Sequence, residues 1–103
     1  MRLVVAVVRP SQVEMVRQAL AGVHVTRLTV CDTQGFDPAT APGQVVQQTI
    51  LEIAVNEDFV DRTVDTLVTA LALGTEDLGT RLFVLPMSEA VQIYRDVRGP
   101  EAL

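Results

Sequence analysis

The stretch TQGFDPATAPGQVV, residues 33–46, separates two segments with strand character, VTRLTVCDT (25–33) and QQTILEIAV (47–55). A hairpin between strands needs only about two to five connecting residues. Here about eleven residues connect the two segments; they include two prolines and two glycines but no cluster of charged or metal-binding side chains. The sequence therefore predicts an antiparallel strand pair joined by an unusually long loop.

The segment before this pair predicts a strand followed by a helix. LVVAVV (3–8) is a continuous, mostly β-branched run of the kind that is buried on both faces of a sheet. SQVE (11–14) predicts the start of the helix, with Ser11 as N-cap and Glu14 completing a capping box. An apolar stripe at spacings of three and four and a C-terminal glycine complete the helix: Val13, Val16, Leu20 and Gly22.

The segment after the pair predicts a second helix and a last strand. Asn56 supplies a cap, and Glu57 and Asp58 supply the acids that a helix N-terminus favours. The buried face of this helix is expected at Val60, Val64, Leu67 and Leu71. GTEDLGTR (74–81) predicts a loop, LFVLPM (82–87) a short strand, and residues 88–103 a tail with a brief helix or strand before it frays.

The resulting order, βαββαβ over a single domain of residues 1–103, predicts an α+β fold of the ferredoxin-like type. Both helices then pack on one face of a four-stranded antiparallel sheet. The other face is partly apolar, and a chain of this length has nothing left to cover it. We therefore expect the chain to form an oligomer through that face.

Composition narrows the possible functions. A net charge of −5 with four aromatic residues argues against nucleic-acid binding, which needs basic grooves and stacking rings. One cysteine, Cys31, excludes an internal disulfide and is typical of the reducing cytoplasm, where we expect the protein. The apolar run at the N-terminus is too short for a signal sequence or a membrane span, so no direct membrane insertion is expected.

Catalytic and metal-binding patterns are weak. The acids Glu57, Asp58, Asp61 and Asp65 have helical spacing, which favours a solvated helix face over an acid–base pair. His24 has no second histidine and no spaced cysteines beside it, and no residue marks a base for Cys31. We therefore expect neither an enzyme nor a metal site.

The loop at 74–81 carries the one pattern that suits a ligand. Two glycines and two threonines precede Arg81, so backbone N–H groups and a cation could meet a phosphate there. The lysine and spacing of a Walker-type loop are absent. A plain helix-to-strand connection remains the alternative.

Four segments, in the right order, resemble the PII family of signal-transduction proteins over nearly the whole chain. AVVRPSQVEMVRQAL (6–20) resembles the first strand, a basic residue followed by proline, and the first helix of that family. LTVCDTQGF (28–36), FVDRTVDTLV (59–68) and TRLFV (80–84) resemble the second strand, the second helix and the start of the last strand.

The resemblance implies a homotrimer that binds ATP or ADP in a cleft between subunits. The residues that match the family's cleft, or lie beside those that match, are Thr29, Gly35, Phe36, Gly79, Thr80 and Arg81. Residues 33–46 then correspond to the T-loop, which reports the ligand state to a partner protein, and residues 74–81 to the glycine-rich B-loop. Family partners are transporters, enzymes of nitrogen assimilation or regulators, so a transporter or metabolic enzyme is the expected kind of target.

The chain departs from the family pattern at the phosphate site. The glycine-rich loop has lost an aspartate and a glycine, and Gln92 and Tyr94 stand in place of two phosphate-binding arginines. Each lost hydrogen bond to a charged group is worth roughly 1.5–3 kcal/mol, so the pair is worth about 3–6 kcal/mol. Tight ATP binding is therefore not expected, whereas binding of ADP, AMP or another metabolite is. Arg95 and Arg98 lie nearby in the sequence and could partly substitute for the two missing arginines.

The T-loop also departs from the pattern. It is about ten residues shorter than usual, and it lacks both the modifiable tyrosine and the lysine that contacts 2-oxoglutarate. We therefore expect no uridylylation or oxoglutarate sensing of the usual kind. Two alternatives stay open: a ligand-free trimeric module for protein interaction, and a metal-responsive trimer of the divalent-cation-tolerance type that would use His24 or the acidic helix.

Overall fold

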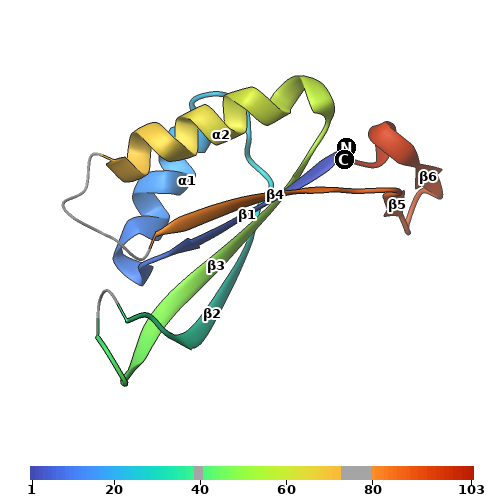
Figure 1. Cartoon of the computed structure of the whole chain (residues 1–103). Helices are drawn as coiled ribbons and strands as arrows, with labels where there is room; N and C mark the ends of the chain where they lie inside the picture. The colour runs from blue at the N-terminus through green and yellow to red at the C-terminus, as the bar shows by residue number, and fades with distance from the viewer. Residues whose placement is uncertain (39–40, 73–79) are drawn as a thin grey trace.

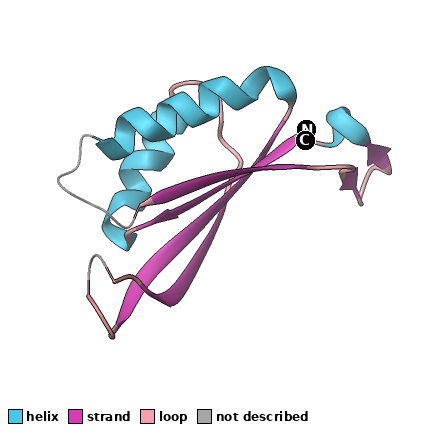
Figure 2. Cartoon of the chain, in the orientation of Figure 1, coloured by secondary structure: helices cyan, strands magenta, loops and turns pink. Residues whose placement is uncertain are grey.

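The computed structural model describes residues 1–38, 41–72 and 80–103 and shows a sheet with both long helices on one side (Figure 1). The sheet order is β2-β3-β1-β4, and every neighbouring pair is antiparallel. Its strands are β1 (Arg2–Val8), β2 (Thr29–Phe36), β3 (Val45–Val55) and β4 (Arg81–Pro86). The helices α1 (Val13–Ala21) and α2 (Glu57–Ala72) form a second layer on one face of this sheet (Figure 2). This confirms the predicted α+β, ferredoxin-like arrangement.

The core lies between this sheet and the two helices. Alternate side chains of the central strands point into it, so Val4 and Ala6 of β1 are fully buried opposite Ile53 and Leu51 of β3. Of the face predicted for α2, Leu67 is fully buried, while Val60, Val64 and Leu71 pack against the core at its rim. Thr63 and Ala70 are also buried. Thr63 was missed because hydroxyl residues are expected outside, yet its Oγ1 donates to the Phe59 carbonyl at 2.7 Å.

A second buried hydroxyl lacks such a partner. Thr49 on β3 is fully buried, and its Oγ1 makes no hydrogen bond to any residue that the structure describes. Replacing an unpartnered buried hydroxyl by a methyl group of the same shape removes a desolvation cost of about 1–3 kcal/mol. We expect Thr49→Val to raise the free energy of unfolding by about 1 kcal/mol in urea denaturation. Thr63→Val is the matched control, since it loses a real hydrogen bond; an equal gain in both variants would contradict the assignment.

The second strand is displaced from its prediction. β2 begins at Thr29 and not at residue 25, because the backbone N–H of Val25 donates to the Leu20 carbonyl at 2.9 Å and Val25 is drawn into the core. The left-handed backbone of His24 (φ 67°) makes this turn at the end of α1. At its other end β2 continues to Phe36, which pairs with Val45. The stretch 33–46 is therefore partly strand, and the connection itself spans residues 37–44.

The predicted capping box at the first helix is wrong, although Gly22 does cap its C-terminus. A 3-10 turn, η1 (Pro10–Gln12), precedes α1, and the Gln12 Oε1 accepts the backbone N–H of Arg9 at 2.9 Å. Glu14 turns to the helix surface and accepts hydrogen bonds from Arg17 and Gln18. These hydrogen bonds, the one from Arg17 first, lower the pKa of Glu14 to about 2.

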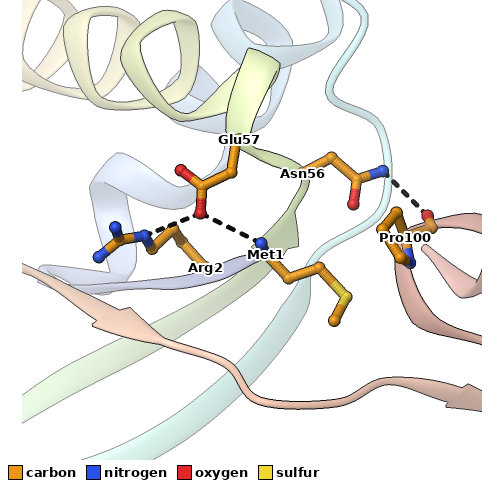
Figure 3. A network of polar contacts seen from close by, with 5 residues as sticks. All are labelled: Met1, Arg2, Asn56, Glu57 and Pro100. Carbon is orange, nitrogen blue, oxygen red and sulfur yellow. Dashed lines mark hydrogen bonds and ion pairs between the residues drawn. The ribbon is translucent and has the colours of Figure 1, made fainter.

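The C-terminal tail is ordered in place of the predicted fraying. It forms a hairpin of β5 (Val91–Gln92) and β6 (Val97–Arg98) and a 3-10 turn, η2 (Gly99–Ala102). The Asn56 Nδ2 donates to the Pro100 carbonyl at 2.9 Å, as Figure 3 shows, and Ala102 is buried. Asn56 does precede α2 as predicted, but its side-chain donor holds the tail.

Glu57, the residue after Asn56, binds the N-terminus beside the C-terminal tail. The Glu57 Oε1 accepts hydrogen bonds from the N-terminal amine at 3.2 Å and from the Arg2 Nε at 3.1 Å (Figure 3). These two hydrogen bonds, that of the amine first, lower the pKa of Glu57. Within the described ranges, no helix is long and apolar enough to span a bilayer.

Candidate functional site

Strand register places three of the six candidate residues on the sheet face that the helices leave uncovered. Thr29 pairs with Glu52, Glu52 with Val5, and Val5 with Phe83, so all four point away from the core. By the same alternation Gly35 and Arg81 belong to this face. We call it the open face; its apolar members include Leu3, Val5, Val7, Val46, Ile50, Ala54, Phe83 and Leu85.

Within one chain these candidates do not meet. Thr29 lies on β2 and Arg81 on β4, which form opposite edges of the sheet, about 14 Å apart at three strand spacings. Arg81 is also two residues along β4 from Phe83, the residue in one row with Thr29, so the two candidates are farther apart than the edges. Thr29 and Gly35 lie at opposite ends of β2, about 20 Å apart at roughly 3.3 Å per residue. A ligand site that combines these residues therefore needs a second copy of the chain.

The first of two hollows lies where β1 ends and β3 and β4 begin. It has a volume of about 330 Å³, and we call it the loop cavity because Asp37, the first residue after β2, is on its wall. Thr80 lies on the same wall and is a predicted site residue. The other polar lining residues are Arg9, Ser11, Gln47 and Gln48. This cavity brings together residues from the base of the predicted T-loop and the end of the predicted B-loop.

The second hollow lies at the other end of the sheet and has a volume of about 550 Å³. We call it the tail cavity, because Ala102 of the C-terminal turn forms part of its wall. Thr29 lines it together with Glu52, His24 and Arg27. The predicted site residues Thr29 and Thr80 are thus divided between two hollows at opposite ends of the sheet.

Unpartnered polar atoms mark both hollows. The buried Thr80 Oγ1 in the loop cavity and the buried Asn56 Oδ1 in the tail cavity make no hydrogen bond within the described residues. The Gln92 Oε1 on the C-terminal hairpin, which lines neither cavity, is also buried without a hydrogen bond to the described residues. Buried polar atoms are normally satisfied, so the two exceptions in the cavities, on Thr80 and Asn56, are polar groups that a bound molecule could satisfy.

Gly35 lies in close contact with the flexible end of the Gln48 side chain. A Cβ on Gly35 would lie 2.2 Å from the Gln48 Oε1, so the Gln48 side chain lies across the glycine and reaches the wall of the loop cavity. Phe36, beside it, is 72% exposed and faces the opposite side of the strand from Gly35. The structure therefore separates the two neighbours, and it leaves Phe36 out of both cavities.

The predicted phosphate-binding loop is described only in part. Gly79 and residues 74–78 lie outside the described residues, while Thr80 and Arg81 begin the approach to β4 and β4 itself. On the tail, the Arg98 Nη1 binds the Glu89 Oε1 at 2.9 Å and so belongs to the hairpin. Tyr94 is fully exposed on the turn of that hairpin.

The described part of the chain offers no cluster of metal-binding side chains to support the alternative of a metal-responsive protein. Within residues 1–38, 41–72 and 80–103, no group of three His, Cys, Asp or Glu side chains is placed to hold a metal ion. His24 lines the tail cavity, and Cys31 is exposed on β2.

Sequence reasoning missed three residues that line the cavities: Asp37, Gln48 and Glu52. Gln48 and Glu52 could have been found, because a polar residue at the outward position of an otherwise apolar strand breaks the expected pattern. Asp37 gave no such signal, since an acid beside a proline is ordinary in a loop.

Comparisons with known proteins identify the family of this chain. The family model described as Nitrogen regulatory protein P-II matches residues 1–97. The Nitrogen regulatory protein GlnK1 of Methanosarcina mazei is 27% identical over 114 residues, which cover 100% of this chain and 97% of that protein. The Nitrogen regulatory protein P-II of Synechocystis sp. is 30% identical over 115 residues, with full coverage of both chains.

Both alignments are longer than the 103 residues of this chain, so each relative carries residues that have no counterpart here. A third relative, the Nitrogen regulatory protein P-II of Rhizobium etli, is 27% identical with full coverage of both chains. The match of the family model over nearly the whole sequence, together with the ferredoxin-like sheet, settles the classification. The chain belongs to the family of nitrogen regulatory protein P-II, a family of signal-transduction proteins.

Proposed function

We propose that this protein is a homotrimeric regulator that binds a small ligand between its subunits and acts by binding a partner protein. The observation that carries the proposal is the placement of Thr29, Gly35 and Arg81 on the open face, at positions that one chain cannot bring together. A neighbouring copy packed against this face would complete the site and would also cover its apolar residues.

The proposed ligand is an adenine nucleotide, ADP or AMP in preference to ATP. Support comes from the loop cavity, where Arg9 offers a cation and the Ser11 and Thr80 hydroxyls offer hydrogen-bond donors. Gln92 and Tyr94 supply no charge on the hairpin, so the binding energy for a triphosphate is small. Arg81 on the open face is proposed to meet the ligand across the subunit boundary.

The proposed output is the connection at residues 37–44. Because it begins at the wall of the loop cavity, a ligand there would change the conformations open to it, and a partner protein would bind one of them. A transporter or a metabolic enzyme is the proposed kind of partner, as for other nitrogen regulators. The short connection carries no tyrosine, so control by the ligand replaces control by tyrosine modification.

Thermal-shift measurements with ADP, AMP and ATP at millimolar concentration test the ligand. A ligand that binds the folded state at one hundred times its Kd stabilises it by about 2.7 kcal/mol, so a rise of several degrees in Tm is expected. Arg81→Ala should reduce the shift without lowering the Tm of the ligand-free protein, since Arg81 is exposed. No shift with any of the three nucleotides would contradict the proposed ligand.

A ligand-free interaction module remains the second candidate, and the C-terminal hairpin favours it. Ile93 and Tyr94 are both almost fully exposed at its turn, and such apolar tips dock into partner proteins. The same thermal-shift series separates the two candidates, because the module predicts no response to nucleotides.

A further inference from the structure

The wall of the loop cavity contains an acidic residue that disfavours phosphate groups. Asp37 is only 6% exposed and lines the cavity with Arg9, Gln48 and Thr80. A carboxylate held away from water interacts with other charges more strongly than one on the surface, because less solvent screens it. Asp37 therefore counteracts the attraction that Arg9 offers to an anion.

The backbone keeps Asp37 in this position. It follows directly on the last pair of the β2–β3 ladder, Phe36 with Val45. Its carbonyl accepts the backbone N–H of Ala41 at 2.9 Å, and the Ala41 carbonyl accepts the N–H of Gln44 at 3.1 Å. The acid thus sits at the hydrogen-bonded base of the connection, on the wall of the loop cavity.

The other polar groups of the cavity suit a ligand of low charge. The Thr80 Oγ1 is buried and has no hydrogen-bond partner among the described residues, and it can donate or accept. The Gln48 side chain, which also reaches the cavity, can do the same without adding charge. Hydroxyl groups and a single phosphate satisfy such a surface better than a chain of phosphates does.

We infer that Asp37 sets the charge selectivity of this site and makes the protein favour nucleotides with few phosphates. The inference rests on the proposed function, in which a nucleotide occupies the cleft between subunits, and it assigns the discrimination between AMP and ATP to one side chain. For a phosphate group placed about 10 Å from the carboxylate, at an effective dielectric constant of about 20, Coulomb's law makes each further negative charge cost about tenfold in affinity.

Isothermal titration calorimetry with AMP, ADP and ATP tests the inference. The titrations are done at fixed ionic strength in EDTA, so that magnesium does not neutralise the phosphates. For the unmodified protein we expect the Kd to increase from AMP to ADP to ATP. Asp37→Asn keeps the shape of the side chain and removes its charge. Relative to AMP binding, it should tighten ADP binding by about tenfold and ATP binding by about a hundredfold, one factor of about ten for each further charge.

Asp32→Asn is the matched control. Asp32 is also on the β2 side of the connection, but it is exposed and does not line the loop cavity. It makes the same change in net charge, so it corrects for the general repulsion between nucleotides and a chain of charge −5. The nucleotide series measured for Asp32→Asn should match that of the unmodified protein.

The possible outcomes separate the inference from the proposal beneath it. If Asp37→Asn binds all three nucleotides with the same ratios of Kd as the unmodified protein, nucleotide binding stands and the role of Asp37 is refuted. If neither form binds any nucleotide, the proposed ligand is refuted and the role of Asp37 with it. An equal gain in Asp32→Asn would also refute the role, because it would assign the selectivity to net charge.

Discussion

Leu51→Ala is expected to lower the free energy of unfolding by about 2–5 kcal/mol. Leu51 is fully buried at the middle of β3, where it pairs with Ala6 on one side and Val30 on the other. Its side chain faces the layer of helices, so truncation leaves a cavity that neighbouring strands cannot close without breaking their register. For a domain of this size the loss is a large part of the total stability.

Urea denaturation followed by circular dichroism measures this loss, at one fixed protein concentration because assembly would add to the apparent stability. Val68→Ala is the control. Val68 is on α2 and 55% exposed, so its truncation removes little packing and places a good helix former on the surface. A midpoint for Leu51→Ala that coincides with that of Val68→Ala would contradict the position of the core between sheet and helices.

Phe83→Glu is expected to convert the proposed trimer into monomers without unfolding the chain. Phe83 is half exposed on β4, opposite Val5 and in one row with Glu52 and Thr29 across the open face. A buried interface would place the new carboxylate against apolar side chains of the next copy. Burying a charge without a partner costs several kcal/mol per subunit, which is enough to dissociate a small assembly.

Size-exclusion chromatography with light scattering checks this result at micromolar concentration. Val68→Glu adds the same charge on the exposed side of α2 and should leave the assembly intact, since α2 lies on the other side of the sheet. Circular dichroism of both variants should match that of the unmodified protein. If Phe83→Glu keeps the mass of the unmodified assembly, the open face is not the interface.

The sheet and helices could be predicted from local patterns in the sequence. The β-branched run of β1 and the apolar face of α2 that contains Leu67 are both buried in the core. Such patterns can be found in the sequence because burial of apolar side chains is the dominant favourable term in folding. The ends of elements could not be predicted as well, because they depend on single hydrogen bonds. The Val25 N–H to the Leu20 carbonyl removed four residues from β2, and the bond between Gln12 and Arg9 replaced the expected cap at Ser11.

The candidate site was less predictable, because it depends on which residues the topology brings to one place. Alternation along β2 and β4 would place Thr29 and Arg81 on the open face, but only the strand order puts them at opposite edges. Likewise, Asp37 and Thr80 are far apart in the sequence and meet at the loop cavity because β1 lies between β3 and β4. No sequence pattern around Asp37 or around Thr80 indicates that the two residues line the same cavity.

Native mass spectrometry of the protein with and without ADP tests the central claim most directly. It reports the number of copies and of bound nucleotides in the same measurement. The account predicts an assembly of three copies of the 11.2 kDa chain that gains up to three ADP molecules, one for each boundary between subunits. A single 11.2 kDa chain that carries no nucleotide at millimolar ADP would contradict it.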